Sequence, residues 1–284
     1  MKLITTVDTG KLPVNISLSD KIMVLGSCFA DGIGARLKDC GFDICLNPFG
    51  TLYNPASIAR AMERLESGRP FSREDCVQMG AGAGLVCSFS HHTSFARLTE
   101  DEFLENANLK LAEASVFWHA CSKVIITLGT AMVWKHGNAV VSNCLKRPAS
   151  EFSHEMLGIE ECGCLVQEIK DRCGDRDVIF TVSPIRHLSQ GAHNNTLSKS
   201  TLLLSLEKAV NLPHTAYFPA FEIMNDELRD YRFYAEDLCH PSKTAVEYIW
   251  ERFTEAAVPG SEHSRMVENE KAARRLAHRS IHQI

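Results

Sequence analysis

Short apolar runs alternate with amphipathic segments along most of this chain. Runs such as KVIITL and DVIFTV are typical of strands that are buried on both faces. Between them, apolar residues recur every three or four positions, as in PASIARAMERL, which is typical of helices packed on one side. The pattern predicts five strands, placed within residues 22–25, 42–46, 123–130, 177–187 and 215–221.

The segments between these strands are predicted to be helical. Helices are expected directly after the first strand and over residues 55–65, 103–122, 155–173, 201–210 and 241–253. This alternation predicts an α/β fold with a parallel sheet and right-handed crossovers. Insertions around 69–98 and 131–154 interrupt it, and the second is predicted to contain a hairpin turning at His136–Asn138. The whole chain is interpreted as one domain, with residues 262–284 as a C-terminal helical extension.

Composition excludes several classes of protein. A net charge of −5 over 284 residues gives no general attraction to nucleic acid. No apolar run reaches the roughly 18 residues of a membrane helix, and the N-terminus lacks the apolar core of a secretory signal. We therefore expect a cytoplasmic protein of bacterial type, with neither membrane nor nucleic acid as partner. The sequence leaves the oligomeric state open.

The eleven cysteines do not form a disulfide framework. Their number is odd, they are scattered, and several lie inside apolar runs. Cys162 and Cys164 are close, but Cys-x-Cys alone is not a zinc spacing. The cysteines are interpreted as reduced and mostly buried, and no metal or cofactor is predicted.

Polar side chains follow the predicted strands, where parallel sheets bind their ligands. Ser27 follows the first strand, and Asp237 and His240 lie together before the last helix. A serine nucleophile needs a base such as an imidazole, and a carboxylate holds that imidazole in one tautomer. These residues predict nucleophilic catalysis. The alternative is structural: Ser27 and Asp237 cap the helices that follow them, and His240 packs on a first turn.

Further candidates surround this group. The Ser27 N–H at a helix N-terminus could bind an oxyanion, and Gly50 and Gly129 allow close backbone approach. Arg186 could bind an anionic substrate group, although an ion pair with a carboxylate is the competing interpretation. The remaining candidates for the substrate site are Tyr53, Asn54, His92 and His187, with packing or surface exposure as the alternative for His91 and His92.

Several long motifs occur in order: GSCFA at 26–30, NPFGTLYNP at 47–55, ITLGT at 126–130, SNC at 142–144, VSPIRH at 182–187 and YRFYAEDLCHPS at 231–242. With them the chain resembles the GSCFA family nearly from end to end. That family is grouped with the SGNH (GDSL-type) hydrolases. The resemblance therefore implies a three-layer sandwich, in which helices cover both faces of a five-stranded parallel sheet in flavodoxin-like order.

The resemblance also implies roles for individual residues. Ser27 would be the nucleophile, His240 the general base, Asp237 the residue that orients it, and Gly50 an oxyanion donor. The chain departs from the SGNH pattern at Gly129-Thr130, where that pattern has Gly-x-Asn-Asp. Either Thr130 donates through its hydroxyl or N–H, or another group such as Asn143 takes the place of the missing asparagine.

The activity implied is that of a serine esterase or deacylase. The acyl group is expected to be small, and by analogy an acetyl group on a sugar or glycan. Two alternatives stay open: an O-acyltransferase with the same triad, and a ligand-binding protein without turnover, which the departure at Thr130 favours. The Gly-x-Ser-x-Gly elbow of α/β-hydrolases is absent.

Overall fold

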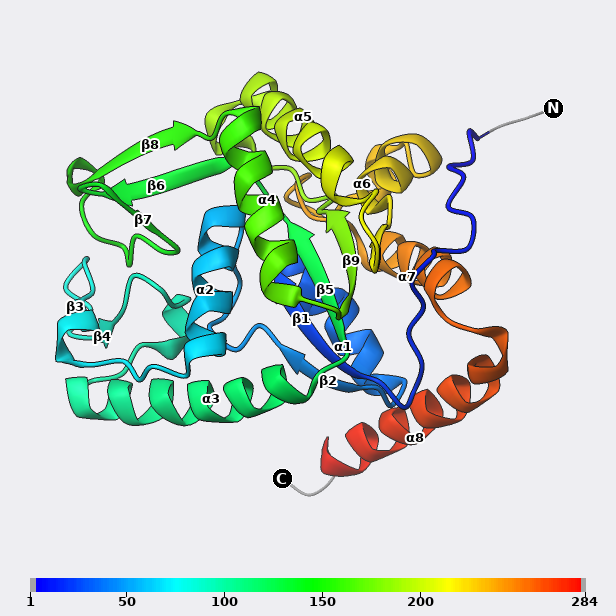
Figure 1. The fold of residues 1–284 in the computed structure, drawn as a ribbon, viewed down its shortest axis with the longest axis horizontal. Coiled ribbons are helices and arrows are strands. Elements are labelled where there is room, and N and C mark those ends of the chain that lie inside the picture. The colour runs from blue at the N-terminus through cyan, green and yellow to red at the C-terminus, as the bar shows by residue number, and fades with distance from the viewer. Residues whose placement is uncertain (1–3, 282–284) are drawn as a thin grey trace.

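The computed structural model describes residues 4–281 and confirms the parallel sheet. The strand order is β10–β9–β5–β1–β2, and every neighbouring pair runs parallel (Figure 1). This is the flavodoxin-like order. The strands are β1 (Lys21–Gly26), β2 (Asp43–Leu46), β5 (Lys123–Leu128), β9 (Asp177–Val182) and β10 (Thr215–Tyr217).

Helices cover both faces of this sheet. Successive side chains of a strand point to opposite sides, so the apolar strands present two apolar faces, and each is buried under helices. In β1, Met23 and Leu25 belong to one core and Ile22 and Val24 to the other. The first core is covered by α2 (Pro55–Ser67), α3 (Glu100–Ala120), α4 (Ile159–Cys173) and α5 (Ala192–Ala209). The second is covered by α1 (Cys28–Asp39), α6 (Ala220–Glu222), α7 (Lys243–Ala257) and α8 (His263–Ile281).

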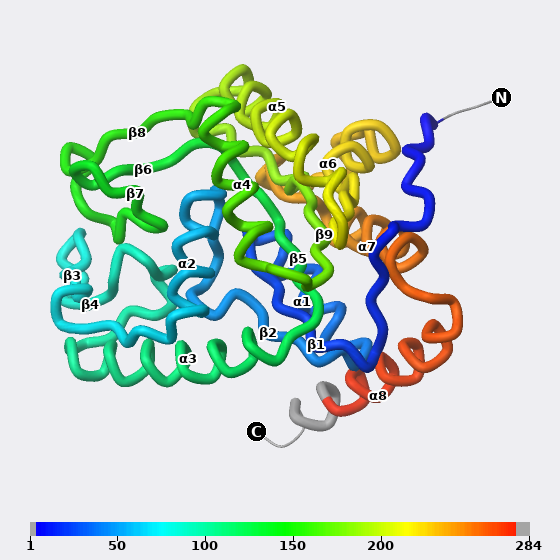
Figure 2. The backbone as a smooth tube through the Cα atoms, viewed as in Figure 1, coloured from blue at the N-terminus to red at the C-terminus, as the bar shows by residue number. Residues whose placement is uncertain are grey.

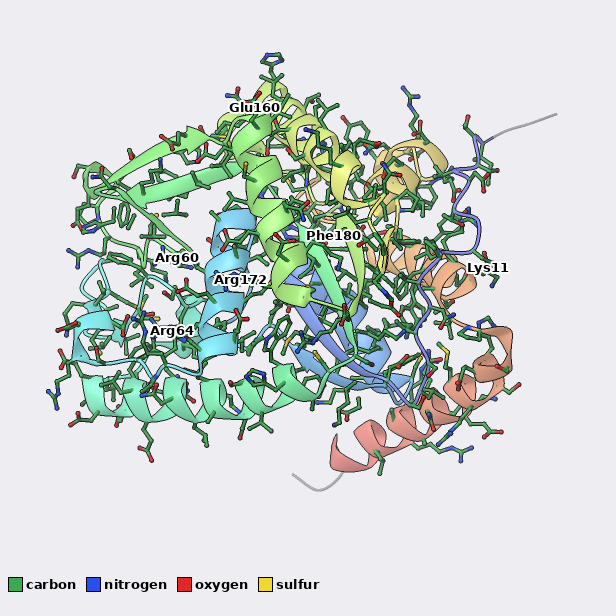
Figure 3. The ribbon with its side chains drawn as sticks, viewed as in Figure 1. Lys11, Arg60, Arg64, Glu160, Arg172 and Phe180 are labelled. Carbon is green, nitrogen blue, oxygen red and sulfur yellow. The ribbon has the colours of Figure 1, made fainter. Side chains whose placement is uncertain are left out.

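Polar contacts join neighbouring helices around these cores. Figure 3 shows Arg172 on α4 beside α2, where its guanidinium donates to Glu66 at 2.8 Å. The C-terminal helix α8 packs on α1, and Glu270 of α8 accepts a hydrogen bond from Arg36 of α1 at 2.7 Å. The helical extension expected over residues 262–284 therefore packs on the domain in its described part, which ends at Ile281.

The two insertions form small antiparallel sheets. The first contains β3 (Val77–Gln78) and β4 (Val86–Cys87), and the second contains β6 (Met132–His136), β7 (Ala139–Val141) and β8 (Phe152–Met156) in the order β7–β6–β8. They lie side by side at one end of the molecule (Figure 2), and the Ser142 N–H donates to the Phe89 carbonyl at 2.8 Å. The hairpin predicted at His136–Asn138 is confirmed.

Several predicted boundaries are wrong; the fourth strand, for example, ends at Val182 and not at 187. The helix predicted from residue 155 begins at Ile159, because Glu155 and Met156 pair with β6 instead. The helix predicted from residue 201 begins at Ala192. Its first turns are polar, so no stripe of apolar residues marks them in the sequence. The last strand ends at Tyr217 and not at 221, just before Pro219, which has no N–H to donate to a ladder.

None of the helices within residues 4–281 is long and apolar enough to cross a bilayer. All eleven cysteines lie in this range and are free thiols. Five of them are buried among apolar side chains, and only Cys164 is exposed.

His91, one of the candidates in the first insertion, is a core residue. Its ring is completely buried, and its centroid lies 4.6 Å from that of Phe71 and 4.7 Å from that of Phe95. Nδ1 is 2.6 Å from the Ser88 hydroxyl, while Nε2 has no partner among the described residues. Burial, with a smaller contribution from the charge of Arg64, lowers the pKa of His91 to about 3.

We expect His91 to make the fold sensitive to acid. The pKa of His91 is lower in the folded state than its ordinary value of 6.5. This difference costs the folded protein no stability above pH 6.5, but the unfolded chain binds a proton that the folded protein does not as the pH falls from 6.5 toward 3. In this window the free energy of unfolding should fall by about 1.4 kcal/mol for each pH unit because of this residue. Urea unfolding from pH 7 to 4.5 should show a shallower pH dependence in His91→Gln. The exposed His119→Gln on α3 is the control, and equal slopes in the wild type and His91→Gln would contradict the assignment.

Candidate active site

Ser27 lies at a sharp turn between β1 and α1. Gly26, the last residue of β1, has φ of 144°, and a Cβ there would come within 2.3 Å of the Thr127 carbonyl oxygen. Only glycine fits this conformation and this contact. The chain turns away from the sheet at this glycine, where β1 lies against β5. Ser27, the next residue, is the N-cap residue of α1.

The Ser27 hydroxyl does not cap this helix. Its side chain accepts no hydrogen bond from the first turn of α1. The residue is completely buried, and Oγ has no hydrogen-bond partner among the described residues. A buried hydroxyl without a partner costs about 1–3 kcal/mol, which makes a purely structural role for this serine a poor explanation.

Asn47, which follows β2, fixes the turn from the side. Its Oδ1 accepts a hydrogen bond from the Gly26 N–H at 2.9 Å, and its Nδ2 donates to Asp31 of α1 at 2.6 Å. Burial raises the pKa of Asp31, against the opposing effect of the Asn47 hydrogen bond. One amide side chain therefore connects the strand end to the first turns of the helix, with Ser27 between them.

Asp237 and His240 form a hydrogen-bonded pair on the loop before α7. Nδ1 of His240 is 2.5 Å from Oδ2 of Asp237, and Oδ1 accepts the backbone N–H groups of Cys239 and His240 at 2.9 Å each. These backbone hydrogen bonds, with the His240 side chain next, lower the pKa of Asp237 to about 2. The carboxylate is therefore ionised at neutral pH and favours the tautomer that leaves Nε2 free to accept a proton. Asp237 does not cap α7, because Ser242 does.

A cavity of about 300 Å³ lies where β1, β5 and β9 end. Six of the predicted site residues line it: Tyr53, Asn54, Thr130, Arg186, His187 and His240. Cys28 lines it as well, whereas Ser27, which precedes Cys28 in the chain, is completely buried and does not.

Gly129, after β5, separates Ser27 from His187. A methyl group on Gly129 would lie 3.2 Å from Cβ of Ser27, 3.4 Å from Nε2 of His187 and 3.0 Å from the Tyr53 carbonyl oxygen. Nε2 of His187 is buried and has no partner among the described residues. Burial, followed by the charges of Lys199 and His240, lowers the pKa of His187 to about 4. At neutral pH it is an uncharged imidazole beside Ser27.

The four N–H groups expected to bind an oxyanion are already occupied. Those of Gly129 and Thr130 both donate to the Tyr53 carbonyl, at 2.8 and 2.9 Å, and that of Gly50 donates to Asn47 at 2.7 Å. The Ser27 N–H makes a longer bond of 3.2 Å to Thr127. The structure therefore leaves none of these four amides free. In the first turn of α1 the Ala30 N–H donates to the Ser27 carbonyl at 2.7 Å, and the Ser27 side chain caps none of the N–H groups.

Asn54 supplies a free side-chain donor. Its Oδ1 accepts the Ser57 N–H at 2.9 Å and thereby caps α2. This bond fixes the orientation of the amide, so Nδ2 is the atom left over, and it has no acceptor within residues 4–281. Asn54 is nearly buried and lines the cavity. The Thr130 hydroxyl also lines it, but it contacts Ser198 Oγ at 2.9 Å and accepts the Met132 N–H at 3.0 Å.

The other substrate candidates divide into two groups. Arg186 and His187 line the cavity, whereas His92 and Asn143 do not. Arg186 donates to the Leu238 carbonyl at 3.1 Å and lies over the Tyr234 ring, and it forms no ion pair within the described residues. Asn143 accepts the Leu145 N–H at 2.8 Å, and its lack of contact with the cavity argues against it as the missing donor.

Lys199 of α5 belongs to the site and is not predicted by the sequence analysis. Its amine is completely buried and donates to the carbonyls of Gly129 at 2.6 Å and Ser183 at 2.7 Å, joining the loops after β5 and β9. Burial lowers its pKa to about 7. A signal was present, because Lys199 shares a helical stripe with Leu202 and Leu206, the stripe that packs on the sheet.

No three His, Cys, Asp or Glu side chains in the described part of the chain are grouped so that they could hold a metal ion.

Among known protein families, the model of the GSCFA family matches residues 21–253. This match covers every strand of the sheet and each residue of the site. No curated protein matches the chain.

Proposed function

The chain belongs to the GSCFA family, and on that premise we propose that it is a serine esterase of SGNH type that hydrolyses a small acyl ester. One observation carries the proposal: at the same edge of the sheet there is a buried, unpartnered serine hydroxyl and an imidazole held by a carboxylate at 2.5 Å. A helix cap would need neither feature. These are the parts that nucleophilic acyl transfer requires.

In the proposed reaction, Oγ of Ser27 attacks the carbonyl carbon of the ester while Nε2 of His240 takes its proton. The tetrahedral intermediate collapses, the C–O bond to the alcohol breaks, and His240 returns the proton to the leaving alcohol. Water, activated by the same imidazole, then hydrolyses the acyl-serine. Asp237 keeps its negative charge throughout and stabilises the imidazolium.

Asn54 is the proposed principal oxyanion donor, in place of the asparagine that the sequence lacks after β5. Its Nδ2 is free, the cap of α2 fixes the orientation of the amide, and Asn54 lines the cavity. The N–H groups at the start of α1 add the positive end of the helix dipole. His187, uncharged at neutral pH and on the other side of Gly129 from Ser27, is proposed as a further donor.

The surroundings of Ser27 favour a small acyl group. Ser27 is completely buried, and its Cβ, the Tyr53 carbonyl oxygen and Nε2 of His187 all lie within 3.4 Å of the position that a Cβ on Gly129 would take. From this crowding we infer that a bulky acyl group would not fit beside Ser27. Access also requires side chains to move, because Ser27 is completely buried and does not line the cavity. Cys28 and Tyr53, which do line it and whose Sγ and hydroxyl are 3.2 Å apart, are the proposed moving parts.

A ligand-binding protein without turnover is the second candidate. It is favoured by one observation: Ser27 makes no hydrogen bond to His240 in this structure. The two are separated by assaying 4-nitrophenyl acetate, butyrate and octanoate. The esterase should hydrolyse the acetate with the highest kcat/KM, whereas absence of turnover on all three would leave the binding protein. Mass spectrometry of the products with an added alcohol identifies an O-acyltransferase, which would form a new ester.

Asn54→Ser tests the oxyanion donor. Serine retains a neutral N-cap for α2 but cannot place an N–H in the cavity. We expect kcat to fall by about 10²–10³, the usual loss for one such donor, with little change in Tm. Asn54→Asp keeps the cap as well and adds a negative charge facing the oxyanion, so it should be no more active. Full activity in Asn54→Ser would assign the oxyanion to other groups.

A further inference from the structure

One wall of the cavity comes from the second insertion. Met132 and Trp134 of β6 and His154 of β8 line it, on the same face of the small sheet. Trp134 and His154 are directly opposite each other in the ladder, and their rings stack with centroids 4.1 Å apart and planes 32° apart. The histidine therefore supports the indole in a fixed orientation.

This indole is unusual among the tryptophans of the chain. Trp134 is 36% exposed, whereas Trp118 and Trp250 are 1% and 5% exposed. An exposed aromatic ring that lines a cavity, stiffened by a stacked partner, offers a flat apolar surface to a ligand.

The groups near this surface are polar and mostly uncharged. Ser142, Ser189, Gln190, Asn194 and Asn195 contribute hydroxyls and amides to the same cavity, and no carboxylate lines it. Such groups pair with a ligand that carries several hydroxyls. Two of these amide atoms are already engaged, since Asn194 Nδ2 donates to the Gln190 carbonyl at 2.9 Å and Asn195 Oδ1 accepts the His187 N–H at 2.8 Å. An aromatic ligand would leave the remaining polar atoms of the cavity without partners, which is unfavourable.

From these features we propose that the β6–β8 wall binds a pyranose ring, as the alcohol part of the ester. The face of a pyranose made of C–H groups would stack on Trp134, and its hydroxyls would contact the polar side chains of Ser142 and of residues 189–195. The cavity, at about 300 Å³, is at the small end of ligand sites and suits a single sugar unit. This inference rests on the proposed function, because it identifies the alcohol whose ester Ser27 would cleave.

Binding tests the sugar site independently of catalysis. Methyl pyranosides of glucose, galactose, mannose and xylose are titrated into Ser27→Ala while tryptophan fluorescence is followed. At least one should change the emission, and adding Trp134→Phe should remove that response because the other two tryptophans are buried. A pyranoside that binds without any contribution from Trp134, or no response to any of the four, would overturn the proposal.

Turnover provides the second arm. Trp134→Ala should lower kcat/KM for glucose pentaacetate about tenfold more than kcat/KM for ethyl acetate, as expected for the loss of one aromatic contact with the sugar. Met156→Ala, on the same face but outside the cavity, is the matched control. An equal loss on both substrates, or a loss confined to phenyl acetate, would contradict a sugar site. If the wild type hydrolyses no ester but still binds a pyranoside through Trp134, the esterase proposal fails and the sugar site stands.

Discussion

Replacing Ser27 by alanine is expected to lower kcat for ester hydrolysis by about 10⁴- to 10⁶-fold, because the substitution removes the nucleophile and leaves only binding and the oxyanion donors. The same change should stabilise the fold by about 1–3 kcal/mol, since it removes a buried hydroxyl that has no partner. Loss of activity combined with a gain in stability is the signature of a catalytic group that is poorly satisfied in the folded protein. Steady-state kinetics and urea unfolding measure the two effects.

Ser57→Ala is the matched control. Ser57 is also buried with an unpartnered hydroxyl, but it lies on α2 and does not line the cavity. It should gain stability in the same way while kcat stays within twofold of the wild type. Retained activity in Ser27→Ala, or an equal loss in Ser57→Ala, would rule out Ser27 as the nucleophile.

Asp237→Asn should lower kcat by about 10⁴-fold without unfolding the protein. The asparagine Oδ1 can still accept the two backbone N–H groups of the loop, but its NH₂ then faces Nδ1 of His240. The imidazole would shift its proton to Nε2, the atom that must accept the proton of Ser27. Because the pKa of Asp237 is about 2, this carboxylate should not contribute an acid limb to the pH–rate profile between pH 4 and 8.

Asp230→Asn provides the comparison for this variant. Asp230 also accepts a hydrogen bond from a backbone N–H two residues ahead, that of Arg232 at 2.9 Å, but it faces no histidine. It should keep full activity. If Asp237→Asn retains more than a tenth of the wild-type kcat, the Asp237–His240 pair has a structural role in the loop.

The sheet could be predicted because its information is local. The apolar runs of β1, β5 and β9 mark strands buried on both faces, and the intervening helices allow only parallel crossovers. By contrast, β8 has the sequence FSHEM, whose polar residues are compatible with a helix until β6 provides a pairing partner. The start of α5 is similarly hidden, because tertiary contacts stabilise it more than its own sequence does.

The site was predictable to a similar extent. Ser27, Asp237 and His240 could be proposed as a group because each follows a recognisable element and their chemistries are complementary. The candidate oxyanion donors could not be chosen, because the availability of an N–H depends on distant contacts: the Tyr53 carbonyl occupies two amides, and the cap of α2 leaves Nδ2 of Asn54 free. Lys199 lies on a recognisable apolar stripe, but its partners could not be predicted, because the loops after β5 and β9 place the two carbonyls around its amine.

The central claim is that His240 activates Ser27 as a nucleophile, and a fluorophosphonate probe tests it most directly. The wild type, Ser27→Ala and His240→Ala are incubated with the probe, and the adduct is located by peptide mass spectrometry. We predict phosphonylation of Ser27 in the wild type, none in Ser27→Ala and much slower labelling in His240→Ala. A folded wild type that stays unlabelled, or an adduct on another residue such as Cys28, would contradict the account.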